Sequence, residues 1–129
     1  MKSFLDPLRR RGAPALALKN TRTDRIVART LLRAFDSASR RRGLLQHDGL
    51  QQGSALVIAP TNAIHTFFMR FAIDVAFVSR DGRVLKVRSD LRPWRVAAAW
   101  RAFAVVESAA GALADAGVQP GDVLRIGAI

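Results

Sequence analysis

The hydrophobic and polar positions alternate most clearly between Ile64 and Val78. Every odd-numbered position from 67 to 77 is apolar, whereas the even-numbered positions mix polar, charged and apolar residues. Successive side chains of a strand point to opposite faces, so this alternation predicts β structure. The stretch is too long for one flat strand, and we expect strands at about 64–70 and 73–79 with a bend near Phe71–Ala72. Four of the seven phenylalanines lie here, which places much of the expected core here too.

Shorter patterns on either side predict further strands and two short helices. The expected strands cover about residues 15–20, 26–35, 55–58, 103–107 and 123–126. Asp36 is a typical N-cap for a helix over residues 37–42, because its carboxylate can accept hydrogen bonds from the free N–H groups of the first turn. Ser108 predicts a cap for a second helix over about residues 109–116, which Gly117 ends.

The Asp81-Gly82 pair predicts a hairpin, and its register has two solutions. A two-residue loop would place Phe77 opposite Lys86 and mix core and charge on one face. A three-residue loop, with the glycine in the left-handed conformation, would place Phe77 opposite Leu85. A slip of one residue moves every side chain to the other face, so the burial pattern favours the three-residue loop.

Together these elements predict a mostly β (α+β) fold, a small β-sandwich or barrel with one or two short helices. A chain of 129 residues fits one domain, and we expect a single β-rich domain over residues 15–129 behind a basic flexible tail over residues 1–14. Residues 49–69 carry no charged side chain, but Gln51, Gln52 and Pro60 within them argue against a membrane span. We therefore expect a cytoplasmic protein without a membrane span.

The amino-acid composition limits the kinds of site that the chain can form. The chain has no cysteine, which excludes disulfides and thiolate zinc sites. The formal net charge of +11 comes from eighteen arginines and three lysines against ten acidic residues. Arginine binds phosphate in a bidentate manner, so an arginine-driven nucleic-acid binder is one alternative for the function. It is not the favoured one, because no recognition module for nucleic acid is visible.

Polar side chains on the even-numbered face of the expected central sheet are candidates for a ligand site. They are Thr66, Arg70, Asp74 and Arg88. Small alanines beside converging donors leave room for a small anionic or polyhydroxyl, sugar-like ligand. The other interpretation is a solvated sheet face with an Asp74–Arg88 pair across the strands. We predict a small non-enzymatic binding module that uses this polar face.

His65 and Glu107 are candidates for polar support of that site. Glu107 is the only glutamate and lies in an apolar stretch, so it needs a partner if it is buried, with Arg70 or His65 as candidates. A hydrolase-like enzyme that uses His65, Asp74 or Glu107 is an alternative, because catalytic sites are recognised by geometry rather than by sequence order. No histidine spacing typical of a metal site and no glycine-rich phosphate loop is present, so we predict neither a metal nor a cofactor.

Trp94 and Trp100 lie among three arginines, Arg92, Arg95 and Arg101. Tryptophan beside arginine is typical of a docking surface for a partner or for nucleic-acid bases. The same segment could equally cover the open end of the sandwich. The two interpretations stay open at this point.

Several motifs, in this order, resemble the signature of the family called domain of unknown function 192. They are Gly43-Leu44-Leu45, the stretch from His65 to Val78, Asp81-Gly82, Pro93-Trp94-Arg95, the stretch from Val105 to Gly111, and Gly121-Asp122. The match extends over about residues 20–127, although the family usually has proline where this chain has Ala72. The resemblance implies a small mostly-β sandwich or barrel with a short helix or two. It implies no established activity.

Overall fold

β-strands supply most of the regular structure in the computed structural model, which describes residues 2–10, 15–42 and 49–128. The strands are β1 (Leu16–Asn20), β2 (Arg25–Ala28), β3 (Thr30–Ala34), β4 (Ser54–Ile58), β5 (Ala63–His65), β6 (Ile73–Val78), β7 (Val84–Leu91), β8 (Val96–Ala98), β9 (Ala104–Ala109) and β10 (Leu124–Ala128). The helices are the 3-10 helix η1 (Asp6–Arg9) and two short α-helices, α1 (Ser37–Arg42) and α2 (Ala112–Asp115). The fold is therefore mostly β with short helices, as the sequence predicts.

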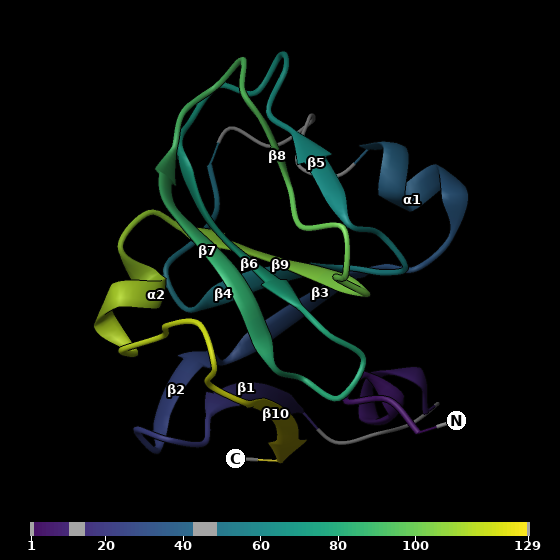
Figure 1. The fold of residues 1–129 in the computed structure, drawn as a ribbon, viewed down its shortest axis with the longest axis vertical. Helices are drawn as coiled ribbons and strands as arrows, with labels where there is room; N and C mark the ends of the chain where they lie inside the picture. Colours follow the sequence, from purple (N-terminus) through teal and green to yellow (C-terminus); the bar gives the residue numbers. More distant parts are fainter. Residues whose placement is uncertain (1, 11–14, 43–48, 129) are drawn as a thin grey trace.

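The strands form three layers (Figure 1). A three-stranded sheet has the order β10-β1-β2, a five-stranded sheet has the order β3-β4-β9-β6-β7, and β5 and β8 form a two-stranded ribbon. The five-stranded sheet lies between the other two layers. The single strand expected over residues 26–35 is in fact β2 and β3, which belong to different sheets. The described strands build a sandwich-like stack and not a closed barrel.

Two hydrophobic cores separate the three layers. One lies between the three-stranded and five-stranded sheets and includes Leu18 and Val106. The other lies between the five-stranded sheet and the ribbon, where Phe77 packs with Ile64 and Ala97. The central strands β6 and β9 are consequently buried along their whole length on both faces.

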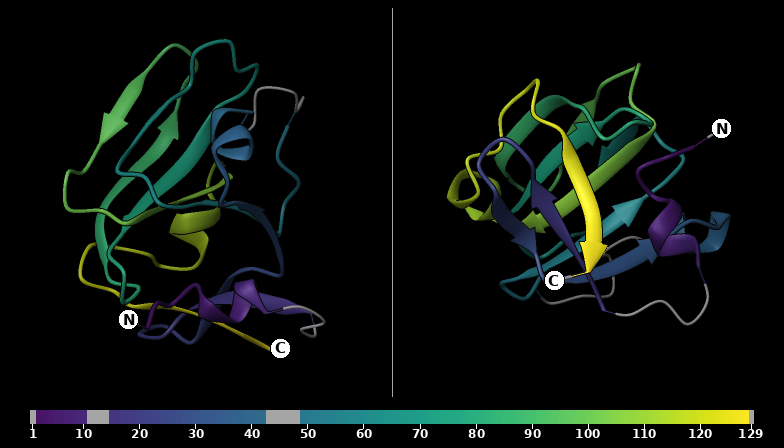
Figure 2. Two further views of the ribbon diagram at one scale, coloured as in Figure 1. Left: turned by 90° about the vertical axis from the view of Figure 1, so that its right-hand side faces the viewer. Right: turned by 90° about the horizontal axis from the view of Figure 1, so that it is seen from below.

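This arrangement corrects the expectation of an open, polar face on the central strand. Asp74, Ala76 and Val78 form the even-numbered face of β6, and all three are fully buried. The three-stranded sheet covers this face, as the side view shows (Figure 2). Its strands alternate only weakly in the sequence, so nothing local indicated that they would pack there.

The hairpin between β6 and β7 turns as predicted. Ser79 N donates a hydrogen bond to Arg83 O at 2.9 Å, and Val78 lies opposite Val84. Gly82 has a φ of +93°, the left-handed conformation that a three-residue loop requires there. A side chain at this glycine would also collide with the carbonyl oxygen of Leu124, so both the turn and the close approach require glycine.

Beyond the turn the predicted register is wrong. A bulge shifts β7, and Phe77 lies opposite Lys86 and not opposite Leu85. Because of the bulge, Val84 and Val87, three positions apart, both pack against the core shared with the three-stranded sheet. A regular strand would turn one of them away. Packing of apolar side chains into the two cores therefore decides the register. It outweighs the preference for keeping charged side chains and core side chains on different faces, which favoured the other register.

Residues 2–10 belong to the segment expected to be a flexible tail, and in the structure they pack against the first core. Leu5 and Leu8 among them are buried in this core. Phe4 N donates a hydrogen bond to Arg80 O at 3.0 Å, and η1 lies beside the three-stranded layer (Figure 2). Two leucines therefore anchor the described part of this basic segment.

The two α-helices are capped differently from each other. Asp36 Oδ1 accepts a hydrogen bond from Ser39 N at 2.7 Å, which confirms Asp36 as the cap of α1. The prediction that Ser108 caps the second helix is wrong, because Ser108 lies inside β9 and α2 begins only at Ala112. Asp74 takes that role from β6, as described below. No helix in the described part of the chain is long and apolar enough to cross a membrane.

Candidate binding surface

Asp74 is a fully buried carboxylate whose oxygens are occupied by backbone groups. Oδ1 accepts a hydrogen bond from Asp90 N at 2.9 Å, and Oδ2 accepts from Gly111 N at 2.9 Å and Leu113 N at 3.2 Å. Charge-assisted hydrogen bonds of this kind are roughly twice as strong as neutral ones. The carboxylate therefore fixes the end of β7 to the start of α2, on the side of the sheet away from the ribbon.

Glu107 lies on the opposite face of the same sheet. In the pairing of β6 with β9, Asp74 is opposite Ser108 and Val75 is opposite Glu107. Glu107 is only 4% exposed, and its Oε2 is buried without a hydrogen-bond partner, so the expected pairing with Arg70 or His65 is not made by this atom. Desolvation by burial raises the pKa of Glu107 to about 7.

The three side chains considered for hydrolysis therefore do not converge. His65 is exposed on the outer face of the ribbon, Asp74 points toward α2, and Glu107 is buried on the ribbon side of the sheet. Catalysis by a nucleophile and a base needs side chains within hydrogen-bonding reach of each other. Within residues 2–10, 15–42 and 49–128, no three acidic or histidine side chains gather closely enough to hold a metal ion.

Thr66, a predicted ligand residue, is buried and holds two loops together. Its Oγ1 donates a hydrogen bond to Arg92 O at 2.6 Å and accepts one from Arg95 N at 2.9 Å. Its backbone N donates to Arg95 O at 2.9 Å, and its carbonyl accepts from Trp94 N at 3.1 Å. Thr66 thus joins the segment that follows β5 to the segment that precedes β8.

Four rings line up above Thr66, and we call them the ring row: His65, Phe67, Trp94 and Phe68. The ring centroids are 4.9 Å apart for His65 and Phe67, 5.8 Å for Phe67 and Trp94, and 4.7 Å for Phe68 and Trp94. These are distances at which aromatic rings attract each other. Nevertheless Phe68 remains 71% exposed and Trp94 57% exposed. The ring row is an ordered aromatic surface that faces water.

The backbone under the ring row is strained. Phe68 has a φ of +67° and Trp94 a φ of +66°, in the left-handed region that bulky residues rarely adopt. Each such residue costs about 1–2 kcal/mol relative to the right-handed region. Strain of this kind persists only where surrounding contacts impose it. At Trp94 the hydrogen bonds of Thr66 do so, and at Phe68 it is the turn that Met69 N closes by donating to Thr66 O at 3.2 Å. Burial does not offset the strain, because both side chains are exposed.

The outer face of the ribbon extends this aromatic surface. Val96 lies opposite His65 and is 61% exposed, and Trp100, beyond the end of β8, is 78% exposed. Between these ends the ribbon presents only the small side chains of Ala63 and Ala98, which are opposite each other. We call the ring row together with Val96 and Trp100 the ribbon surface. It has large apolar side chains at both ends and only small side chains in between.

The ribbon surface is also basic. Residues 60–72 and 91–103 contain four arginines, at positions 70, 92, 95 and 101, and no aspartate or glutamate. The Arg101 guanidinium lies 4.8 Å from the centre of the Trp100 ring. Lys86 adds a cation from the edge strand β7, because its Nζ donates a hydrogen bond to Ala98 O at 2.9 Å. This part of the molecule therefore attracts anions.

The structure divides the predicted ligand residues between two sides of the five-stranded sheet. Thr66 and Arg70 belong to the segment after β5, and half-buried Arg88 lies on the same face of β7 as Lys86, toward the ribbon. Asp74 is on the far side. A ligand role for these four residues stays a prediction.

Phe67 and Phe68 were missed as site residues. Phe68 interrupts the mixed even-numbered positions with a large ring, which was the available signal. Trp94 and Trp100 were recognised in the sequence as a docking surface or a cover for the sandwich. Their exposure favours the first interpretation.

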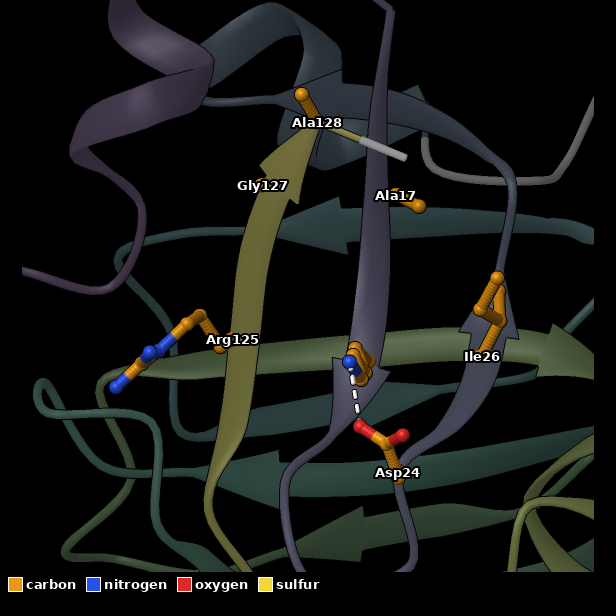
Figure 3. Close-up of a pocket in the computed structure, with 7 residues that line it drawn as sticks. Ala17, Asp24, Ile26, Arg125, Gly127 and Ala128 are labelled. Atoms are coloured by element: carbon orange, nitrogen blue, oxygen red, sulfur yellow. Dashed lines mark ion pairs between the residues drawn. The ribbon is translucent and has the colours of Figure 1, made fainter.

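A groove of about 340 Å³ on the outer face of the three-stranded sheet is one competing site (Figure 3). It is lined by Ala17, Lys19, Asp24, Ile26, Arg125, Gly127 and Ala128. Lys19 and Asp24 form an ion pair with each other at 2.5 Å, and Arg125 points away from the other labelled side chains. The groove offers no converging polar groups, so the ribbon surface is the stronger candidate.

The three stacked layers with two cores define a small α+β sandwich domain. The chain matches the family model DUF192 (Uncharacterized ACR) over residues 18–126. It belongs to this family, as the sequence motifs indicated. No curated protein matches the chain.

Two solved structures share the fold. A protein of unknown function from Novosphingobium aromaticivorans is 22% identical, with a TM-score of 0.73 over 85% of this chain and 82% of that one. A protein described as a putative transcription regulator from Sinorhizobium meliloti is 19% identical, with a TM-score of 0.74 over 85% of this chain and 90% of that one. At these identities the likeness concerns the fold alone.

Proposed function

We propose that the protein is a non-enzymatic binding module that holds an anionic ligand with a planar ring on the ribbon surface. The observation that carries the proposal is the ring row, in which the exposed side chains of Phe68 and Trp94 occupy strained backbone without burial. Strain in a sparsely populated backbone region is a reason to look for a function. Here it turns two aromatic side chains toward solvent beside arginines.

A ligand with a ring and a negative charge uses both features of this surface. Its ring stacks on exposed Trp94 or Phe68, and its anionic group is attracted to the arginines at positions 92 and 95. Thr66 fixes the two loops before the ligand arrives, so binding has little ordering entropy to overcome. Preorganisation of this kind raises affinity without any additional contact.

The surface suits an anion better than a neutral polyhydroxyl ligand. Hydroxyl groups are bound well where carboxylates can accept their protons in hydrogen bonds, and residues 60–72 and 91–103 provide no carboxylate. The side-chain amide of Asn62 is engaged with Trp100 O at 3.2 Å. Of the two ligand classes that the sequence suggested, we therefore favour the anionic one.

Tryptophan fluorescence tests the proposal directly, because Trp94 and Trp100 are the only tryptophans and both lie on the ribbon surface. The probes are adenosine monophosphate, adenosine and inorganic phosphate. We expect adenosine monophosphate to change the emission at lower concentration than either part alone, since it combines ring and charge. Trp94→Ala should weaken this binding at least severalfold, with Trp100 as the remaining reporter.

Arg125→Ala is the matched control, because Arg125 is exposed on the opposite, three-stranded layer. This variant should bind adenosine monophosphate like the unmodified protein. The proposal is contradicted if all three probes leave the emission unchanged. It is also contradicted if a neutral disaccharide binds in their place, or if Trp94→Ala binds adenosine monophosphate as well as Arg125→Ala does.

A further inference from the structure

We infer that the ligand of the ribbon surface is single-stranded nucleic acid, an inference that rests on the binding role proposed above. The surface offers several rings in succession and several cations, and residues 60–72 and 91–103 carry no acidic side chain, although exposed Asp90 directly precedes the second range. Such a pattern fits a chain that repeats a planar base and a phosphate. A mononucleotide would use only part of it.

The rings are arranged for more than one base. The ring row has three successive contacts between 4.7 and 5.8 Å, and Trp100 stands apart at the other end of the ribbon surface. Trp100 lies six positions after Trp94, a span of at most about 20 Å at the rise of a strand. That is the length of about six stacked nucleotides at about 3.4 Å each. Exposed rings at both ends can therefore stack on different bases of one strand.

The cations follow the same path. Arg92 and Arg95 flank Trp94 in the chain, and Arg101 lies against the ring of Trp100. Lys86, which binds Ala98 O and lies 6.0 Å from the ring centre of buried Phe77, adds positive charge at the edge of the ribbon. Phosphates are bound by such cations without regard to base sequence. Stacking and charge together predict binding with little sequence specificity.

A duplex fits the surface less well than a single strand. Stacking on Trp94 or Phe68 requires a free base face, and in a duplex the faces are covered by neighbouring base pairs. Reading a major groove usually requires an inserted helix or a two-stranded ribbon with polar side chains. The helices in the described ranges are at most six residues long, and on its outer face the ribbon carries two alanines, a valine and a single polar side chain, His65. The rings would have no partner on a duplex.

The test compares an eight-nucleotide deoxyadenylate, the corresponding RNA, the same DNA as a duplex, and adenosine monophosphate. Binding of the full-length protein is followed by tryptophan emission and by the anisotropy of a labelled oligonucleotide. We expect either single strand to bind at least about 10-fold more tightly than adenosine monophosphate and than the duplex. Comparison of the DNA with the RNA shows which of the two nucleic acids the protein binds more tightly.

Salt dependence reports the phosphate contacts. With about three cations engaged, the logarithm of the affinity should fall with the logarithm of the salt concentration with a slope of about −2. A rise from 50 to 200 mM salt then weakens binding about 20-fold. Arg95→Ala should reduce this loss to about 7-fold, because one phosphate contact is removed. Arg125→Ala, on the opposite layer, should retain the full salt dependence.

Stacking is tested separately. Trp94→Ala should weaken binding of the octanucleotide by about 5- to 150-fold, the range for loss of one stacked base. Trp94→Phe keeps a ring and should restore most of the affinity. An unchanged circular dichroism spectrum would show that Trp94→Ala folds. If this folded variant binds the octanucleotide with unchanged affinity, the inference is overturned.

The remaining outcomes separate this inference from the proposed function. If adenosine monophosphate binds at Trp94 but the octanucleotide binds no more tightly, the nucleic-acid inference is wrong and the binding module stands. If neither binds, both are wrong. If vesicles with anionic lipids change the emission and the octanucleotides do not, the ribbon surface is a membrane contact, and the nucleic-acid inference is overturned.

Discussion

Replacement of Glu107 by glutamine should make the stability of the protein less dependent on pH. Glu107 is buried on the central strand β9, and its Oε2 has no hydrogen-bond partner. Burial of a carboxyl group disfavours its ionised form. Glutamine has the same shape and remains neutral at every pH, so the variant Glu107→Gln removes the cost of ionisation and little else.

The magnitude follows from the two pKa values of the carboxyl group. Its pKa is 4.5 without burial and about 7 in the folded protein. Below pH 4.5 the carboxyl is protonated in both states. Between 4.5 and about 7 the unfolded chain has lost the proton and the folded chain keeps it, so rising pH favours unfolding by about 1.4 kcal/mol per pH unit. Above about pH 7 the loss is complete, at about 3 kcal/mol.

Urea denaturation followed by circular dichroism measures this loss. The free energy of unfolding is compared for the unmodified protein and Glu107→Gln at intervals from pH 4.5 to pH 8. All other titratable groups are common to both proteins, so the difference isolates Glu107. The advantage of the variant should grow by about 3 kcal/mol over this range, or about 1 to 3 M in the urea midpoint at the usual slopes.

A constant difference between the two proteins from pH 4.5 to pH 8 would refute this reasoning. It would mean that Glu107 titrates alike in the folded and unfolded states. A growing disadvantage of the variant toward high pH would refute it more strongly, because it would show that a cation stabilises the buried carboxylate.

Three further substitutions test other parts of the account. Phe68→Gly should be more stable than Phe68→Ala by about 1 kcal/mol in urea denaturation, because glycine accepts the left-handed backbone at φ +67° without strain; equal stability would show that the strain is absent. Asp74→Ala should lower the free energy of unfolding by at least about 3 kcal/mol, since three backbone N–H groups lose their acceptor; a loss below about 1 kcal/mol would contradict that role. Asp122 accepts a hydrogen bond from the Arg22 side chain, which holds the pKa of Asp122 below its ordinary 3.8. Its stabilising contribution is thus present above pH 3.8 and lost as the pH falls through the lower folded value, so the deficit of Asp122→Asn should shrink in acid; a deficit that persists at pH 2 would argue against the ion pair.

Local patterns in the sequence were enough to find most strands and one cap. The apolar run at residues 55–58 and the stretch 103–107 correspond to β4 and β9, and Asp36 caps α1. The Asp81-Gly82 pair correctly predicted the turn between β6 and β7. These features depend on neighbours within a few residues, which is the range over which alternation, capping and turn chemistry act.

Features that depend on distant segments were not visible. Asp74 looked like a solvent-facing ligand residue because alternation does not reveal that a second sheet covers its face. The same carboxylate caps α2, 37 residues further along the chain at Gly111, and Ser108 seemed a closer candidate. The bulge in β7 likewise follows from the demand of two cores and not from the local sequence.

The candidate surface was only half predictable. Trp94 and Trp100 with their arginines are an unusual composition, and composition alone identified them. That Phe68 joins Trp94 depends on Thr66, which brings two loops together that are 26 residues apart in sequence. A hydrogen-bonded clamp of this kind has no sequence signature.

The most direct measurement of the central claim is the nuclear magnetic resonance signal of the two tryptophan indole N–H groups. Both tryptophans lie on the ribbon surface, so each indole reports on it alone. The octanucleotide and adenosine monophosphate should shift the Trp94 indole signal in a saturable manner, and Trp94→Phe should remove the shifted signal while the folded spectrum is retained. If either ligand binds and both indole signals stay in place, the ligand occupies another part of the molecule and the ribbon surface is not the binding site.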